Sequence, residues 1–319
     1  MKKSIFAFAA ALAALVACNK NDVAPMQPQN QESLVPCELT VGICGAMTKA
    51  TAVSADNEAK VNNLQVFVFR GDDLDAYASV DNAQELTLSC TAGDRVVYAL
   101  VNAPEYSAVP GKAALLAKVS ELSANSLTNF EMVGSKSVTL PQSEKVSIDV
   151  NRIASRVVLK KITRSFTSEA LQALNFKVDA IYLINVAGNT SYDLSAAPAK
   201  WYNVAENKNE LASLLYDAPA SLITNGQSYS TAHTFYAYPN DLATNTTRLV
   251  IETTLGETKY YYPINLPEMA ANKSYEIEEV KITRPGSDNP DEPVSFADAT
   301  FSINVIDWTV VPVTEGTTI

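Results

Sequence analysis

The chain has 319 residues, 47% of them hydrophobic and 18% charged, so it is long enough for two ordinary domains and can bury real cores. Its 24 basic and 35 acidic residues give a net charge of −11, which argues against nucleic acid as a partner. A single histidine, His233, and four cysteines without a CxxC pair argue against zinc and iron–sulfur sites, so we predict no metal, no cofactor and no enzyme activity.

The N-terminus has the pattern of an export signal. Lys2 and Lys3 precede an apolar run, residues 5–17, that is too short to span a bilayer as a permanent helix. The run ends in Leu-Val-Ala-Cys at residues 15–18, which resembles the lipobox of bacterial lipoprotein precursors. This resemblance implies cleavage after residue 17 and acylation of Cys18, which would anchor the precursor to a membrane. The alternative is a plain secretory signal with an incidental cysteine.

A polar spacer and a lone strand follow. Residues 19–36 are rich in proline, glutamine and asparagine, a composition that does not fold alone. Apolar residues then alternate at Leu39, Val41 and Ile43, which predicts a half-buried strand. Residues 47–58 are small and polar, and Lys49 is the only basic residue between Lys20 and Lys60.

The next hundred residues read as β-structure with one helix. Residues 64–69 form a continuous apolar run that ends in a turn cluster at 70–73, and an alternating segment at 86–90 is joined by a turn to the apolar run 95–101. Residues 112–122 predict a helix, because Ala114, Leu115, Leu116, Val119 and Leu122 cover one face. Strands resume at 137–140 and 145–150.

A second unit is predicted to start near Asn151. The segment 152–162 carries charge on one face and aliphatic side chains on the other, and strands follow around 176–185, 234–238, 248–255, 257–264 and 274–282. Short strands separated by Gly, Asn, Asp and Pro turns are typical of antiparallel sandwiches. The prediction is therefore an all-β chain with two tandem β-sandwich domains.

The apolar pattern of the C-terminal segment changes face. Phe301, Ile303 and Val305 share one face, and the apolar set then moves to Ile306, Trp308 and Val310, which predicts a strand turned over by a bulge at 305–306. The segment is either an ordinary terminal strand or an outward-reaching apolar strand. A strand of the second kind needs a partner groove, since it would otherwise aggregate.

The whole arrangement resembles the fimbrillins, the FimA-type major subunits of type V pili of Gram-negative anaerobes. The most specific matches are AKVNNLQVFVF and CTAGDRVVYALVNA within 50–103, RIASRV at 152–157 and INVIDWTVVPVTEG at 303–316. The resemblance implies transthyretin-like or Ig-like Greek-key sandwiches, a short helix in the first, and a C-terminal donor strand. The expected parts are a signal peptide (1–17), a tether with a removable strand (18–49), two sandwiches (50–150 and 151–285) and a linker with the donor strand (286–319).

The resemblance also implies a mechanism. A lipoprotein precursor reaches the outer membrane, a protease of trypsin-like specificity cuts after a basic residue, and the leading strand leaves its sheet. The C-terminal strand of another subunit fills the groove, so the expected partners are further copies and accessory fimbrial subunits, and the mature location is the cell-surface fimbrium. The candidate cut is Lys49–Ala50, although family members often carry Arg there. The removable strand holds Leu39, Val41 and Ile43; the donor strand holds Ile303, Val305, Ile306, Trp308, Val310 and Val311.

Two other functions stay open at this point. One is an accessory or tip adhesin of the same fimbria. The other is a glycan-binding surface lipoprotein, for which tyrosines at 236, 238 and 260–262 could form a stacking platform, although aromatic residues on strands are more often core. The disulfide state of Cys37, Cys44 and Cys90 also stays open.

Overall fold

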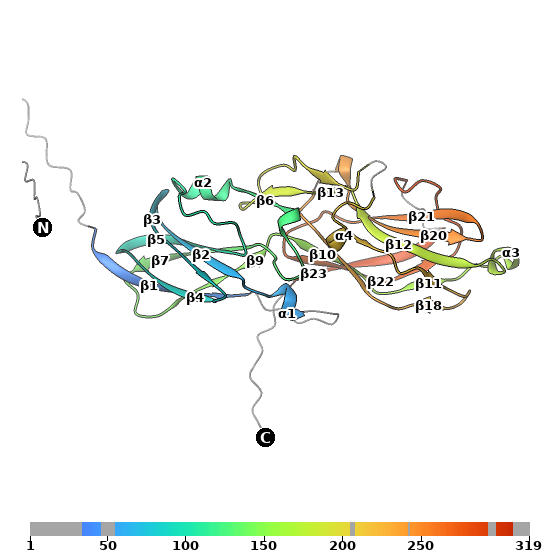
Figure 1. Cartoon of the computed structure of the whole chain (residues 1–319), viewed down its shortest axis with the longest axis horizontal. Helices are drawn as coiled ribbons and strands as arrows, with labels where there is room; N and C mark the ends of the chain where they lie inside the picture. The colour runs from blue at the N-terminus through green and yellow to red at the C-terminus, as the bar shows by residue number, and fades with distance from the viewer. Residues whose placement is uncertain (1–33, 46–54, 205–207, 242, 293–297, 309–319) are drawn as a thin grey trace, which may run out of the picture. The chain divides into compact units, whose positions relative to one another are not determined.

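The computed structural model describes residues 34–45, 55–204, 208–241, 243–292 and 298–308. The described residues from Val35 onward form one compact unit built mainly of β-strands (Figure 1), which confirms the all-β fold. Helices in these segments are only three to five residues long. None of them has the length and hydrophobicity needed to cross a membrane. The predicted domain boundaries stay a prediction.

Two sheets hold the strands of the first half of the chain. A three-stranded sheet has the order β4-β1-β8, and a five-stranded sheet has the order β3-β2-β5-β7-β9. Their bounds are β1 (Pro36–Cys44), β2 (Asn63–Arg70), β3 (Asp73–Asp81), β4 (Glu85–Thr91), β5 (Gly93–Val101), β7 (Met132–Leu140), β8 (Val146–Asp149) and β9 (Asn151–Arg152).

The strand β2 forms because its apolar run is buried on both faces, as the sequence predicts. Every residue from Leu64 to Phe69 is buried, including the polar Gln65. The Gln65 amide donates to the carbonyl oxygens of Ala103 (3.1 Å) and Pro104 (2.8 Å), so its burial leaves no unpaired amide group. Gly71, with a φ of +64°, turns the chain into β3.

Two larger sheets hold the second half. One has the order β18-β11-β22-β10-β19, with β23 paired to β22, and the other has the order β16-β12-β20-β21, with β17 paired to β12. Their bounds are β10 (Ser155–Leu159), β11 (Ile162–Arg164), β12 (Phe176–Ile184), β16 (Tyr216–Asp217), β17 (Ser221–Leu222), β18 (Ser228–Tyr229), β19 (His233–Ala237), β20 (Arg248–Leu255), β21 (Thr258–Asn265), β22 (Lys273–Ile282) and β23 (Ala299–Asp307). Most described pairs are antiparallel as predicted, but β1–β8, β10–β22 and β11–β22 are parallel.

The predicted helix at 112–122 is wrong beyond its first turn. The helix α2 spans only Lys112–Leu116, and β6 (Val119–Glu121) pairs with β14 (Asn189–Ser191). Long-range pairing overrides the helical periodicity there, and Val119 is exposed while Leu115 and Leu122 are buried. The remaining short elements are α1 (Ala55–Glu58), η1 (Leu122–Ala124), α3 (Glu169–Gln172), α4 (Ala212–Leu215), η2 (Ala243–Asn245), β13 (Val186–Ala187) and β15 (Trp201–Tyr202).

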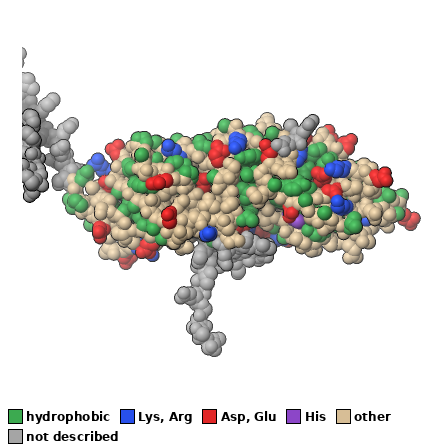
Figure 2. Space-filling model, in the orientation of Figure 1, with side chains coloured by type: hydrophobic (Ala, Val, Ile, Leu, Met, Phe, Trp, Pro, Cys, Tyr) green, Lys and Arg blue, Asp and Glu red, His purple; other side chains and the backbone are tan. Residues whose placement is uncertain are grey.

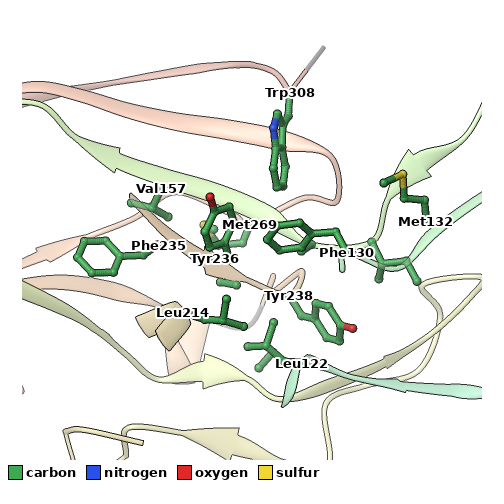
Figure 3. Close-up of a cluster of buried hydrophobic side chains, with 14 of the residues drawn as sticks. Leu122, Phe130, Met132, Val157, Leu214, Phe235, Tyr236, Tyr238, Met269 and Trp308 are labelled. Carbon is green, nitrogen blue, oxygen red and sulfur yellow. The ribbon is translucent and has the colours of Figure 1, made fainter. Parts of the chain in front are cut away.

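The hydrophobic core is continuous across the sheets of both halves. Buried residues from β1 through β23 form one cluster, and a small second cluster lies around Tyr182. Figure 3 shows part of the main cluster, where Phe130, Tyr236 and Trp308 come together from segments far apart in the sequence. These contacts place Trp308, the residue that follows β23, in the protein interior.

Candidate functional site

The strand β1 is the middle strand of its sheet, between β4 and β8. It runs antiparallel to β4, from Pro36 opposite Thr91 to Gly42 opposite Glu85. On its other side it runs parallel to β8, from Val41 to Cys44. Its removal would therefore leave two strands with unpaired backbone groups on either side of a groove, a site that accepts another strand.

The three residues predicted for the removable strand lie where β1 meets the core. Leu39 and Val41 are buried, and Ile43 is half-buried and packs against the same cluster. Each fully buried aliphatic side chain of this size contributes roughly 1.5–3 kcal/mol. A strand that replaces β1 must therefore supply apolar side chains at the same alternating positions.

Several predicted site residues lie outside the described residues. These are the lipidation residue Cys18, the cut at Lys49–Ala50, and two donor-strand residues, Val310 and Val311. The cut falls between Gly45, the last described residue after β1, and the start of α1 at Ala55. The linker that contains Lys49 therefore joins β1 to the rest of the described chain.

The wall of the groove formed by β4 is fastened to β3 by a buried carboxylate. Asp75 on β3 accepts hydrogen bonds from the Thr91 backbone N–H (2.9 Å), the Thr91 hydroxyl (2.6 Å) and the Arg95 Nε (3.0 Å). Both charged side chains are almost fully buried. Burial alone would raise the pKa of Asp75, but the hydrogen bonds from Thr91 and Arg95 outweigh it and hold that pKa below its ordinary value.

This carboxylate predicts acid-sensitive stability. Because the pKa of Asp75 is lower in the folded state, its contribution is present above about pH 4 and is lost as the pH falls through the folded value. We expect Asp75→Asn to lower the free energy of unfolding by about 3 kcal/mol at pH 7, since Arg95 loses its buried partner. The difference in the free energy of unfolding between this variant and the wild type should be smaller when urea titrations are carried out at pH 3. The exposed Asp81→Asn on the same strand is the control; an equal difference at both pH values would contradict the assignment.

The second wall, β8, lies unusually close to β7. A Cβ on Gly134 would lie 2.1 Å from the carbonyl oxygen of Asp149, so only glycine permits this approach. On the open side, the Lys145 Nζ forms an ion pair with Glu85 at 2.6 Å, and the Lys145 side chain passes directly over Gly42 of β1. The ion pair between Lys145, which precedes β8, and Glu85 of β4 thus connects the two walls across β1.

The predicted donor strand is an edge strand of its own sheet. β23 runs antiparallel to β22, from Ile282 opposite Ala299 to Lys273 opposite Asp307 (Figure 1). The predicted turn-over at 305–306 is wrong, because the pairing is regular from Ile303 to Asp307 and the irregularity lies between Ile277 and Val280 of β22. Val305 and Ile306 are 49% and 47% exposed. Among the described strands, β23 pairs only with β22, and no pair joins it to β1.

Beyond β23, Trp308 enters a buried cluster around Glu58 of α1. Glu58 is 2% exposed, and its carboxylate accepts from the Arg156 Nη1 (3.0 Å), the Trp308 Nε1 (3.2 Å) and the Tyr236 hydroxyl. Its backbone carbonyl oxygen accepts from the Arg152 Nε (3.1 Å) and Nη2 (3.0 Å). We call these five residues the Glu58 cluster. It connects the first element after Lys49, the start of the second half and the end of β23.

Aromatic contacts complete the Glu58 cluster. The centre of the Trp308 ring lies 5.6 Å from the ring centre of Phe130 and 5.7 Å from that of Tyr236 (Figure 3). The guanidinium carbon of Arg152 lies 4.6 Å from the centre of the Trp308 ring. Burial lowers the pKa of Arg152 to about 10, and the nearby negative charge of Glu58 partly opposes this shift. The sequence predicts charge on one face at 152–162, but Arg152 is buried rather than solvated.

The other residues noted in the sequence have structural roles. Tyr236, Tyr238 and Tyr262 are buried, so the five tyrosines do not form an exposed stacking platform. The His233 Nδ1 lies 2.6 Å from an Asp217 carboxylate oxygen on the neighbouring β16. On the face in Figure 2, hydrophobic side chains are scattered among polar and charged ones.

Part of the chain matches a known protein family. Residues 38–157, which contain β1 from Glu38 onward, the two strands beside it and both arginines of the Glu58 cluster, match the family model of the major fimbrial subunit protein (FimA). These residues are fimbrillin sequence of the FimA type. The predicted resemblance to fimbrillins is thereby confirmed.

Solved structures show the same fold over most of this chain. A candidate cell adhesion protein from Bacteroides eggerthii is 21% identical, with 86% of this chain and 97% of that chain covered and a TM-score of 0.69. A fimbrilin (FimA) from Porphyromonas gingivalis is 16% identical, with 86% and 98% covered and a TM-score of 0.63. A C-terminally truncated tip fimbrial protein from Porphyromonas gingivalis is 12% identical, with 86% and 100% covered and a TM-score of 0.55. Since a fimbrilin and a tip fimbrial protein share this fold, the fold does not distinguish between these two kinds of protein.

Proposed function

We propose that this protein is a fimbrillin and serves as a structural subunit of a fimbrial shaft that supports adhesion to host cells or other bacteria. It is made as an outer-membrane lipoprotein precursor, acylated at Cys18, and a protease of trypsin-like specificity cuts it at Lys49–Ala50. Polymerisation then proceeds by donor-strand exchange with other copies and with accessory subunits. The observation that carries the proposal is the central place of β1, bounded by β4 and β8 and followed by the linker with Lys49.

The geometry supports exchange after the cut and suppression before it. While the linker is intact, β1 competes for its own groove at a high effective concentration. After the cut, only pairing and burial hold β1, whereas the Glu58 side chain keeps α1 on the body of the protein. The contact between one subunit's groove and another subunit's C-terminal strand is heterologous, so it builds an open filament.

The C-terminal strand has the properties that a donor needs. β23 lies at a sheet edge, so it can leave without dividing its sheet as the loss of β1 would. Val305 and Ile306 leave about half of their surface exposed, so insertion into a groove would bury apolar area that the monomer leaves in water. Donation of the whole segment would also withdraw Trp308 from the Glu58 cluster.

The direct test is trypsin titration of the precursor beginning at Asn19, read by N-terminal sequencing and by native gel electrophoresis. Cleavage after Lys49 followed by a ladder of multimers is the expected result. A protein that is nicked at Lys49 yet stays monomeric would contradict the shaft assignment. That outcome would favour an accessory or tip subunit, or a glycan-binding lipoprotein.

Two truncations test the donor strand. A chain that ends at Gly286 lacks β23 and Trp308, so we expect cleavage at Lys49 without multimers and a lower urea midpoint, since the Glu58 cluster loses its indole. A chain that ends at Trp308 keeps β23 and the cluster but lacks Val310 and Val311. We expect it to keep the wild-type urea midpoint and to form no multimers. A normal ladder from the chain ending at Gly286 would rule out this donor.

A further inference from the structure

Two cysteine thiols face each other, one on the removable strand β1 and the other on the neighbouring strand β4. Cys37 on β1 is directly opposite Cys90 on β4, and their Sγ atoms are 3.7 Å apart. Both cysteines are free; Cys90 is 5% exposed and Cys37 is half-buried. Directly opposed residues of antiparallel strands have Cβ atoms about 4.5–5.5 Å apart, close to the spacing that a disulfide needs.

We propose that Cys37 and Cys90 form a redox-controlled crosslinking site, which an extracytoplasmic thiol–disulfide oxidoreductase oxidises to a disulfide that holds β1 in its groove. This inference rests on the proposed removal of β1 in assembly. Disulfides persist outside the cytoplasm, where the proposed precursor resides. The crosslink selects which precursors assemble, because only the reduced form releases β1 after the cut at Lys49.

The reaction balances as a thiol–disulfide exchange. The Cys37 thiolate attacks the disulfide of the oxidoreductase and releases one of its thiols, which leaves a mixed disulfide on Cys37. The Cys90 sulfur gives up its proton, attacks the Cys37 sulfur and releases the second thiol. Two protein thiols are thus oxidised to one disulfide while the oxidoreductase disulfide is reduced to two thiols. Burial raises the pKa of Cys90 to about 12, so the exchange starts at the more accessible Cys37.

The third described cysteine provides a matched control on the same strand. Cys44 is exposed and lies opposite Asp149 on β8, and its thiol donates to an Asp149 carboxylate oxygen at 3.0 Å. No cysteine faces it across either neighbouring strand, so it cannot form a crosslink within β1's own sheet. Cys44→Ser should therefore leave the proposed switch intact.

The experiment compares the precursor beginning at Asn19 after reduction with dithiothreitol and after treatment with oxidised glutathione. Mass spectrometry should show the loss of two hydrogen atoms and a crosslinked peptide that joins Cys37 to Cys90. After trypsin, the oxidised protein should retain the fragment ending at Lys49 on a non-reducing gel. We expect it to form multimers roughly 100-fold more slowly than the reduced protein, because the tethered strand reoccupies its groove.

The variants separate the possible outcomes. Cys44→Ser should behave as wild type, whereas Cys37→Ser should release its fragment and form multimers at the same rate with and without glutathione. If oxidised and reduced wild type polymerise equally fast, or no crosslinked peptide forms, the crosslinking site is overturned while the proposed function stands. If the reduced wild type is cut at Lys49 but keeps its strand and forms no multimers, the proposed function fails instead.

Discussion

Replacing Lys49 with alanine is expected to give a folded precursor that does not polymerise after trypsin treatment. The substitution removes the only basic residue between Lys20 and Lys60, so the linker stays intact and β1 remains tethered. A tethered strand reoccupies its groove faster than a free donor can enter, and we expect multimer formation to fall by roughly 100-fold or more. The measurement is a time course on native gels, with the urea midpoint as evidence that the variant is folded.

Two lysine controls make this result specific. Lys49→Arg should restore both cleavage and multimers, because a trypsin-like protease accepts either basic residue. Lys60→Ala should leave both unchanged, since Lys60 lies in ordered structure, with its N–H bonded to the Asn57 carbonyl oxygen at 3.2 Å and its own carbonyl oxygen bonded to Asn102 at 2.8 Å. Multimers from Lys49→Ala at the wild-type rate would place the activating cut elsewhere.

The removable strand could be predicted because its signal is local. Leu39, Val41 and Ile43 alternate with period two, and that period places them on one face of a strand whatever its neighbours are. The neighbours themselves could not be predicted. The pairing of Leu39 with Leu88 and of Val41 with Val146 is set by long-range packing, so the central position of β1 appears only in the fold.

The predictions that failed concern segments whose local pattern competes with distant partners. Residues 112–122 have helical periodicity, yet β6 is drawn into a pair with β14. The apolar shift at 305–306 resembles a bulge, but it arises because Ile306 stays exposed in a regular strand while Trp308, only 1% exposed, enters the Glu58 cluster. Both the pairing of β6 with β14 and the burial of Trp308 depend on distant residues, so the local sequence pattern predicts neither of them.

The Glu58 cluster cannot be predicted from the sequence for a related reason. Glu58 sits in a polar stretch that reads as a solvated linker, and Arg152 and Arg156 read as the charged face of a strand. Burial of these charges depends on their meeting in space, which no spacing in the sequence reveals. The RIASRV segment at 152–157 contains both arginines, but nothing in it identifies Glu58 as their partner.

Replacing Glu58 with glutamine is expected to lower the free energy of unfolding by about 3 kcal/mol, because the largely buried Arg156 guanidinium then keeps only the more distant carboxylate of Glu276, at 3.9 Å, as a counter-charge. The two Glu58 carboxylate oxygens accept from Arg156, Tyr236 and Trp308, and an amide offers one acceptor fewer and points a donor at another donor. Burial and the negative charge of Glu58 both raise the pKa of Tyr236, so its hydroxyl stays protonated and donates a hydrogen bond to the carboxylate. Urea unfolding followed by circular dichroism measures the loss.

A surface ion pair supplies the matched control for this variant. Glu278 pairs with Lys160 at 2.6 Å, but its side chain is about half exposed, so Glu278→Gln should cost at most about 1 kcal/mol. The fluorescence of Trp308 gives a second readout, with the half-buried Trp201 replaced by phenylalanine so that a single indole remains. We expect Glu58→Gln to shift that emission to longer wavelength as Trp308 loses its acceptor and gains solvent. A stable variant with unchanged emission would show that Glu58 does not hold the end of β23 in place.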